Sequence, residues 1–199
     1  MIPLIWIGIG ILLGSMPFSF WLGRLILDTD IRRYGDGNPG AFNAWRAGGR
    51  QVGLLALSLD YLKGAIPVGL ANYGFGVTGW WLVAAALSPV LGHAFSPFLR
   101  FRGGKAVAVT FGIWTGLTLW RCPTILGCLL GIFYSLQSMD GWSVILSMTG
   151  ILVYFLLRQA DIFILIIWSG NILILTWKHR HDLRQRIRLR PSILNALRR

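Results

Sequence analysis

The chain has 199 residues, of which 55% are hydrophobic and only 13% are charged, and its formal net charge is +12. A soluble domain carries about 25% charged residues, so this composition excludes an ordinary soluble protein and indicates an integral membrane protein. The positive charge does not indicate nucleic-acid binding, because the basic residues lie between apolar runs and in the C-terminal tail.

Apolar stretches predict about seven membrane-spanning helices, since a span needs about 20 mostly apolar residues. The candidate spans are residues 3–23, 52–73, 80–98, 106–120, 123–136, 143–157 and 162–177. Three of them are short, so five or six full spans with re-entrant pieces are the alternative. The first stretch lacks a basic region before it and is expected to be a retained span, not a signal peptide. We therefore expect an all-α integral membrane protein with a single membrane domain over residues 1–199 and a basic tail over residues 178–199.

The basic residues predict the orientation of these spans, because they accumulate in cytoplasmic segments. If the tail lies inside, every Lys and Arg except Lys63, Arg121 and Arg158 falls on the inner side or in the tail. An odd number of spans then places the N-terminus outside. The polar segments between spans are expected to meet at the cytoplasmic face.

Residues 30–49, DIRRYGDGNPGAFNAWRAGG, form the first polar segment and are predicted to be a loop. Asn-Pro, Asp-Gly and the glycines are turn signals, and glycine lets backbone N–H groups approach a ligand closely. Such groups bind anions, and a nearby arginine adds two parallel hydrogen bonds. The stretch indicates a site for an anionic head group at the membrane surface; a solvated polar linker is the alternative.

Asp60 and Lys63 stand three residues apart in the second predicted span and share a helix face. Charges at that depth are costly unless they are paired or face a polar interior. A self-satisfying ion pair and a role in the site are both consistent with this spacing.

The second polar segment, residues 92–109, reads GHAFSPFLRFRGGKAVAV. Gly103 and Gly104 precede an apolar helix and predict a phosphate-binding helix start, to which Lys105 adds a point charge. Lys105 could equally be a basic anchor at the membrane edge. His93 could bind substrate or cap backbone groups at the end of its span.

The tail begins WKHRHDLRQRIRLR and predicts a basic interfacial helix on anionic lipid, with Leu183, Ile187 and Leu194 on one face. His179 lies at the depth where the polar segments meet, where a histidine can donate a hydrogen bond or carry charge. The cysteines, Cys122 and Cys128, form neither a metal-binding pattern nor a disulfide framework.

Together these segments resemble the bacterial acyl-phosphate:glycerol-3-phosphate acyltransferases, the PlsY family. Residues 30–46 resemble the signature DxRxxGSGNxGxTNxxR, and residues 92–108 resemble GHxFPxFLxFxGGKGVA. Three shorter matches are SMPF at 15–18 to Ser-x-Pro-Phe, DYLKG at 60–64 to DxxKG, and HRHDL at 179–183 to HRxNI. The order and spacing of these pieces extend over nearly the whole chain.

The resemblance implies transfer of a fatty acyl group from acyl phosphate to glycerol 3-phosphate, giving lysophosphatidic acid and phosphate for phospholipid synthesis. It implies no metal and no coenzyme, a bacterial inner membrane, seven spans with the N-terminus outside, and an active site facing the cytoplasm. The catalytic residues it suggests are Arg46, Lys105, His179 and Asp36. Those expected to bind substrate are Gly35, Gly37, Asn38, Gly40, Asn43, His93, Gly103, Gly104, Asp182 and Ser147. The partners expected are these two substrates and membrane lipid; oligomeric state is not predicted.

Some positions depart from the family pattern. Asp36 stands where the family has serine, Phe42 where it has threonine, and Ala106 where it has glycine. A carboxylate near a phosphate is repulsive by about 1–4 kcal/mol at contact distance. Asp36 is therefore expected to pair with Arg32, Arg33 or Arg46, or to act as a base. A relative with another acceptor or no catalysis is the first alternative function, and a small-anion transporter is the second.

Overall fold

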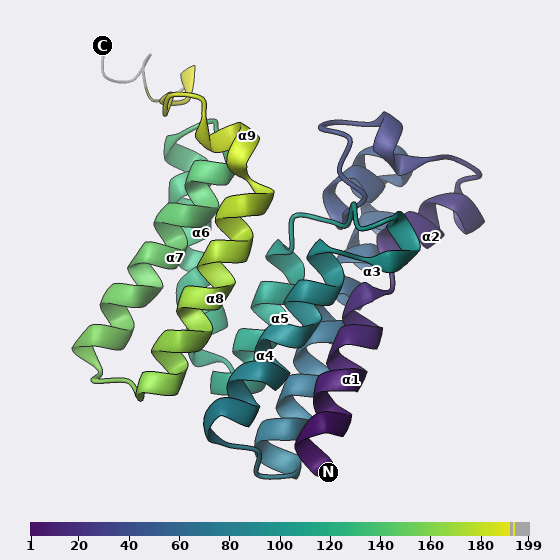
Figure 1. Ribbon diagram of the computed structural model, residues 1–199. Helices are drawn as coiled ribbons and strands as arrows, with labels where there is room; N and C mark the ends of the chain where they lie inside the picture. Colours follow the sequence, from purple (N-terminus) through teal and green to yellow (C-terminus); the bar gives the residue numbers. More distant parts are fainter. Residues whose placement is uncertain (192, 194–199) are drawn as a thin grey trace.

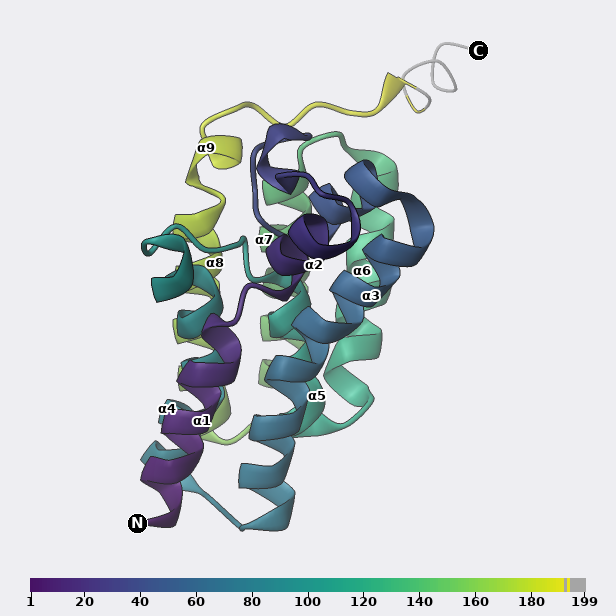
Figure 2. The ribbon, with the colours of Figure 1, turned by 90° about the vertical axis from the view of Figure 1, so that its right-hand side faces the viewer.

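The computed structural model describes residues 1–191 and 193, and the regular secondary structure of this part is helical apart from one isolated bridge between Gln137 and Leu189. The long helices lie side by side and run alternately up and down (Figures 1 and 2). The N-terminus lies at one end of this bundle and α9 at the other (Figure 1). The prediction of an all-α protein is confirmed.

The helices are α1 (Ile2–Ser15), α2 (Phe18–Ile26), α3 (Ala41–Gly69), α4 (Gly79–Ala94), α5 (Val107–Thr118), α6 (Arg121–Leu136), α7 (Asp140–Leu157), α8 (Ile162–Lys178) and α9 (Arg180–Leu183). Short 3₁₀ turns occur at Ile31–Arg33 (η1) and Pro97–Leu99 (η3), and a π-helical turn at Leu70–Gly74 (η2).

Four helical segments are long and apolar enough to cross a membrane: Ile2–Ile26, Ala41–Gly74, Gly79–Leu99 and Asp140–Leu157. Three shorter apolar helices, α5, α6 and α8, pack among them. Many large apolar side chains point away from the bundle, among them Leu4, Leu12, Leu54, Ile66 and Leu173. An outward apolar surface of this extent is suited to lipid contact.

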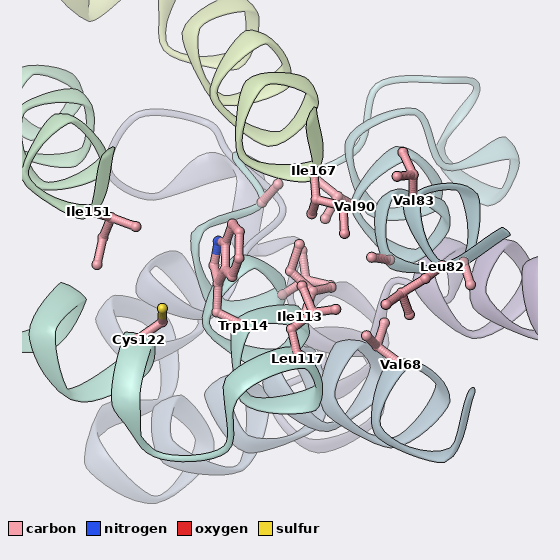
Figure 3. Packing of buried hydrophobic residues seen from close by; sticks show 14 of the residues in the cluster. Val68, Leu82, Val83, Val90, Ile113, Trp114, Leu117, Cys122, Ile151 and Ile167 are labelled. Atoms are coloured by element: carbon pink, nitrogen blue, oxygen red, sulfur yellow. The ribbon is translucent and has the colours of Figure 1, made fainter. Parts of the chain in front are cut away.

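The core lies mainly between α3, α4, α5, α7 and α8, with contributions from α1 and α6, and its largest fully buried side chain is Trp114 of α5 (Figure 3). The Trp114 ring packs on Phe155, with centroids 5.2 Å apart, and its indole N–H donates to Asn171 Oδ1 at 3.0 Å. Asn171 therefore links helices, as expected of a polar residue within a membrane bundle. Glycines allow the closest contacts: a Cβ on Gly112 would collide with the Tyr61 carbonyl of α3.

The first predicted span is not continuous. The chain breaks at Met16–Pro17, and α2 lies across the end of the bundle (Figure 2). Pro17 has no N–H for the helical ladder, which explains the break. The buried Lys63 ammonium donates to the Met16 carbonyl at 2.9 Å, so it caps the end of α1.

Asp60 and Lys63 form the predicted ion pair, with 2.7 Å between Nζ and Oδ1. Asp60 Oδ2 also accepts from the Ser19 hydroxyl of α2 at 2.6 Å. Both charges are almost fully buried. The pair is therefore structural in part, because it joins α1, α2 and α3 at their meeting point.

Residues 30–49 are only partly a loop. α3 begins at Ala41, well before the predicted start of the second span, and Gly49 interrupts it with φ 71°. Residues 41–48 contain three alanines, which favour a helix once the turn before them has ended. The loop prediction was wrong for this half of the segment.

The tail is not a continuous basic helix. α9 ends at Leu183, and the following residues run extended beside the α6–α7 turn, where the Ser138 N–H donates to the Arg188 carbonyl at 2.9 Å. Arginine alternates with other residues from Arg184 to Arg190, a period of two that is typical of extended chain. Leu194, predicted on the apolar face, lies outside the described residues.

Candidate active site

A cavity of about 730 Å³ is lined by residues of the loop before α3, the segment before α5 and the end of α8, among others. These segments meet at the end of the bundle that carries α2 and α9 (Figure 2). Its wall includes polar residues at that end, which we call the polar mouth: Asp36, Asn43, Arg46, Lys105 and His179. Its other wall is apolar, formed by side chains such as Leu57 and Leu62 of α3, Phe111 of α5 and Leu130 of α6. The cavity therefore joins a charged end to an apolar interior.

The loop before α3 is anchored by Asp30. Its carboxylate caps η1 by accepting from the Arg32 N–H at 3.0 Å, and it forms an ion pair with the Arg32 guanidinium at 2.7 Å. These hydrogen bonds lower the pKa of Asp30 to about 2. The loop is held in place by a charged cap, so its later residues reach the cavity from a fixed base.

Gly35 allows the loop to contact α3. It adopts φ 56°, and a Cβ there would collide with the Arg46 guanidinium and the Asn43 amide. A larger residue would therefore be excluded by both conformation and space. Within residues 1–191 and 193, the Arg46 guanidinium forms no hydrogen bond or ion pair, and it lies 5.5 Å from the centre of the Phe42 ring.

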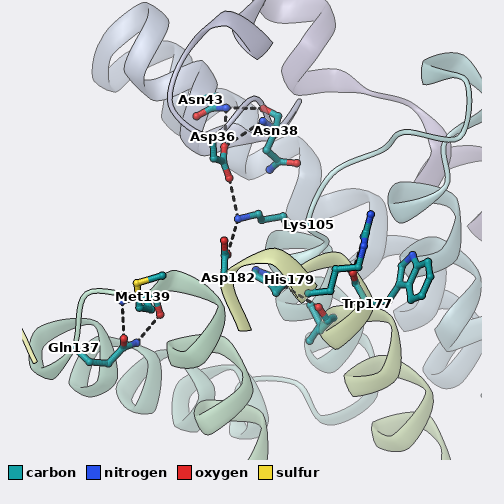
Figure 4. Close-up of polar contacts among 11 residues, drawn as sticks. Asp36, Asn38, Asn43, Lys105, Gln137, Met139, Trp177, His179 and Asp182 are labelled. Atoms are coloured by element: carbon teal, nitrogen blue, oxygen red, sulfur yellow. Dashed lines mark hydrogen bonds and ion pairs between the residues drawn. The ribbon is translucent and has the colours of Figure 1, made fainter. Parts of the chain in front are cut away.

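Asp36 pairs with Lys105 and with none of the three arginines we expected (Figure 4). Its Oδ2 lies 2.9 Å from Lys105 Nζ, and its Oδ1 accepts from the Asn38 N–H at 3.1 Å and the Asn43 amide at 3.0 Å. Partial burial raises the pKa of Asp36, but the Lys105 contact and these hydrogen bonds outweigh it and leave the pKa below its usual value. Asp36 is therefore a carboxylate at neutral pH.

Lys105 connects the loop to the tail. Its ammonium also lies 2.8 Å from Asp182 Oδ2 in α9, so it stands between two carboxylates (Figure 4). Burial lowers the pKa of Lys105, but the two carboxylates raise it by more than burial lowers it. The pKa of Lys105 therefore lies above its usual value. The next residue, Ala106, adopts φ 64°, a conformation that suits the glycine found there in the family pattern.

Gly103 and Gly104 pack against the end of α4 and do not line the cavity. The Gly104 N–H donates to the His93 carbonyl at 3.1 Å, and a Cβ on either glycine would collide with His93. Lys178 holds the same turn by donating to the Ala94 and Gly103 carbonyls at 2.9 and 2.8 Å. Both glycines are buried in these contacts and the Gly104 N–H is already bonded, so their packing does not support the phosphate-binding role predicted for them.

His179 is buried at the end of α8 and lines the cavity. Its Nδ1 lies 2.9 Å from the Leu175 carbonyl. A carbonyl only accepts, so Nδ1 carries the proton in the neutral ring and Nε2 can accept a hydrogen bond. Burial lowers the pKa of His179, which keeps the ring neutral near pH 7.

The remaining predicted residues divide into two groups. Asn38, Gly40 and His93 line the cavity together with the residues of the polar mouth. Asp60 also lines it, and its Oδ1 lies 3.8 Å from His93 Nδ1. The others lie outside its wall: Gly35, Gly37, Gly103, Gly104, Ser147 and Asp182. Ser147 is buried within α7, where its hydroxyl donates to the Ser143 carbonyl at 2.7 Å.

Four polar residues of the cavity were missed: Ser58 and Tyr61 of α3, Tyr134 at the end of α6 and Asp140 at the start of α7. Tyr134 and Asp140 flank the short α6–α7 turn. The polar break between the fifth and sixth predicted spans indicated this turn. Nothing in the sequence showed that the turn lies next to the polar segments at residues 30–49 and 92–109.

The fold and the cavity define a polytopic helical membrane protein with a charged site, containing Arg46 and Lys105, at one end of its bundle. The family described as Glycerol-3-phosphate acyltransferase matches residues 4–188. The chain belongs to this family, which confirms the resemblance seen in the sequence.

Individual relatives match over most of their length. Glycerol-3-phosphate acyltransferase 1 of Thermotoga maritima is 38% identical over 193 residues, which cover 90% of this chain and 95% of that protein. The enzyme of the same name from Desulfovibrio desulfuricans is 35% identical over 200 residues, covering 96% of this chain and 83% of that one.

Two crystal structures of PlsY (YgiH), an integral membrane glycerol 3-phosphate acyltransferase, share the fold. The glycerol 3-phosphate form gives a TM-score of 0.85 at 26% identity and covers 98% of both chains. The lysophosphatidic acid form gives 0.81 at 28% identity and covers 92% of this chain and 90% of that one.

Proposed function

We propose that this protein transfers a fatty acyl group from acyl phosphate to glycerol 3-phosphate, giving lysophosphatidic acid and inorganic phosphate. One observation carries the proposal: a single cavity joins the cations Arg46 and Lys105 to an apolar wall. Phosphate-bearing groups need the first and a fatty acyl chain needs the second. Family membership and the glycerol 3-phosphate and lysophosphatidic acid forms of PlsY support the same reaction.

In this reaction a hydroxyl oxygen of glycerol 3-phosphate bonds to the acyl carbon, and the bond from that carbon to the phosphate oxygen breaks. The hydroxyl proton leaves with the released phosphate. Arg46 and Lys105 neutralise phosphate and the charge that develops on the acyl carbonyl oxygen. His179 Nε2 can accept a hydrogen bond from the acceptor. Holding both substrates in line supplies much of the rate without a dedicated general base.

The acceptor lies in the polar mouth. Asn38, Gly40 and Asn43 contribute amide and backbone groups there, and the Arg46 guanidinium is available as a bidentate partner for phosphate. The Lys105 ammonium has three N–H donors, and its contacts with Asp36 and Asp182 use two of them. The third is left for phosphate, although the two carboxylates already offset the positive charge.

The protein is expected to be a single membrane domain in a bacterial inner membrane, with about seven spans, the N-terminus outside and the polar mouth facing the cytoplasm. The distribution of Lys and Arg supports this orientation. The alternation of the long helices supports an odd number of passes, since the N-terminus and α9 lie at opposite ends (Figure 1).

A second function is suggested by Asp36. Its carboxylate forms an ion pair with Lys105, and this negative charge at the site favours an acceptor less anionic than glycerol 3-phosphate. Transport of a small anion is less well supported, because a transporter binds its substrate near the bilayer midplane and the charged groups here gather at one end of the bundle.

The reaction is tested with purified protein in detergent, palmitoyl phosphate and glycerol 3-phosphate, following inorganic phosphate and lysophosphatidic acid in the same samples. We expect equal amounts of both products, and almost no phosphate release when glycerol 3-phosphate is omitted. Phosphate release without lysophosphatidic acid would indicate a hydrolase. Transfer to glycerol in preference to glycerol 3-phosphate would support the second function.

A further inference from the structure

The apolar part of the cavity ends abruptly at Phe111. On α5 the wall includes Ala108 and Phe111 but not Thr115, one turn further into the bundle. On α6 it includes Leu130 but not Leu126, which lies one turn beyond. The cavity therefore stops at the same level on both helices.

A second, much smaller void lies behind this end. It has a volume of about 10 Å³ and is lined by Thr110, Leu126, Val144, Met148 and Leu175, together with residues of the cavity wall. The residues that line both spaces are Val107, Phe111 and Leu130. These three side chains are a thin partition between the cavity and the interior of the α5–α8 half of the bundle.

Phe111 is the largest member of this partition; its ring contacts α6, and its backbone carbonyl is hydrogen-bonded within α5. The ring lies against α6 at Gly127, where a Cβ would come 3.7 Å from Phe111 Cε1. The Thr115 hydroxyl donates to the Phe111 carbonyl at 2.9 Å and accepts from the Tyr61 hydroxyl at 2.9 Å. Tyr61 also lines the cavity, so α3 and α5 are tied together just beyond its end.

We propose that Phe111, with Leu130 beside it, sets the longest acyl chain that the protein uses efficiently. The inference rests on the proposed function, because it assumes that the apolar wall holds the acyl chain of the donor. A chain that reaches the partition must displace the Phe111 ring or leave the cavity toward lipid. Shorter chains fit without either change, so the partition discriminates by length.

The test compares the wild-type protein with Phe111→Ala across dodecanoyl, palmitoyl and eicosanoyl phosphate. A difference of one methylene in an apolar pocket changes kcat/KM by roughly 10- to 200-fold. We expect Phe111→Ala to raise the eicosanoyl-to-dodecanoyl ratio of kcat/KM by about tenfold or more. The KM for glycerol 3-phosphate should stay the same. Phe111→Leu should shift the ratio in the same direction but less, and it replaces Phe111→Ala if that variant fails to insert.

Leu126→Ala is the matched control, because Leu126 lines the small void but not the cavity. It enlarges the void and leaves the partition in place, so its chain-length ratio should equal that of the wild type. An unchanged ratio in both Phe111 variants would overturn the proposal and indicate that the chain leaves toward lipid. Equal shifts in Leu126→Ala and Phe111→Ala would also overturn it. A wild-type protein inactive with every acyl phosphate would instead contradict the proposed function.

Discussion

The Lys105 ammonium lies 2.9 Å from Asp36 and 2.8 Å from Asp182, whereas Arg46 has no such partner among residues 1–191 and 193. The two cations of the polar mouth therefore differ in availability. Arg46 can offer its whole guanidinium to phosphate, whereas Lys105 has one N–H donor left beyond its two carboxylate contacts. This difference gives each residue a separate test.

Arg46→Ala and Lys105→Ala are each expected to lower kcat/KM for acyl transfer by at least about tenfold, since a hydrogen bond to a charged group contributes about 1.5–3 kcal/mol. Arg50→Ala is the matched control, because Arg50 lies on the same helix outside the cavity and should keep wild-type activity. Near-normal turnover in either cavity variant, with thermal stability unchanged, would contradict the assignment.

Asp36→Ser is expected to lower the KM for glycerol 3-phosphate, because it removes a carboxylate from the acceptor site and frees Lys105 from one of its two partners. The double variant Asp36→Ser/Phe42→Thr should raise activity further. Asp161→Ser is the control, since Asp161 caps α8 through the Phe163 N–H and serine is also a good cap.

Loss of activity in Asp36→Ser, with the protein still folded, would show that the carboxylate itself recognises the acceptor or takes part in the reaction. Unchanged kinetics in both variants would mean that the loop does not bind the acceptor. These outcomes separate the proposed acceptor from a less anionic one.

For individual residues, the sequence predicted which side chains belong to the site but not which of them form ion pairs with one another. The spacing of residues within a motif cannot show that Lys105 reaches Asp36, because the two residues lie on different segments whose packing depends on α3 and α5. The same limit explains Gly103 and Gly104, whose small size serves contact with His93. Tyr134 and Asp140 were missed because their turn joins the cavity only in the folded bundle.

Among the elements, the short turn η1 depends most directly on one charge. The pKa of Asp30 falls from 3.8 to about 2 through its hydrogen bonds to Arg32. A lowered carboxylate pKa contributes stability that is present above the unfolded value and is lost as pH falls through the folded value. Asp30 therefore stabilises the loop at neutral pH and loses this effect between pH 3.8 and about 2.

Asp30→Asn is expected to lower the thermal unfolding temperature at pH 7, and its difference from the wild type should shrink as pH falls from 3.8 toward 2. The measurement is thermal unfolding in detergent across this pH range. Asp28→Asn, an exposed change in the same loop, should stay close to the wild type throughout. A constant difference at all pH values would show that the amide changes packing and not charge.

The approximate places of the long apolar helices could be predicted, because each of them coincides with an apolar stretch of the sequence. Their interruptions could not. Pro17 ends α1, but the position of α2 after this break depends on residues far away in the sequence. The Ser19 hydroxyl donates to Asp60, and the Trp21 ring packs on Phe98 at a centroid distance of 5.7 Å. The helical part of residues 41–49 was missed because glycines there were read as loop signals, although only Gly49 leaves helical geometry.

For the whole molecule, the sequence predicts one charged face, and the structure gathers the polar mouth at one end of the bundle. Arg121 and Arg158, which the charge pattern placed on the other side, stand at helix ends away from the polar mouth. The proposed topology follows if this bundle crosses the membrane along its length. It requires that the α4–α5 and α6–α7 turns face the same compartment.

Single cysteines test this requirement in a background where Cys122 and Cys128 are replaced by alanine. Arg102→Cys and Ser138→Cys lie on exposed turns at the polar end, and Arg158→Cys lies exposed at the α7–α8 turn. With a membrane-impermeant maleimide, we expect Arg158→Cys to react on intact cells and the other two only after permeabilisation. If Arg102→Cys and Ser138→Cys reacted on intact cells and Arg158→Cys only after permeabilisation, the cavity would face outward and cytoplasmic substrates could not reach it. If Arg102→Cys and Ser138→Cys reacted from opposite sides, Lys105 and Asp140 could not share one cavity, and the proposed site itself would be wrong.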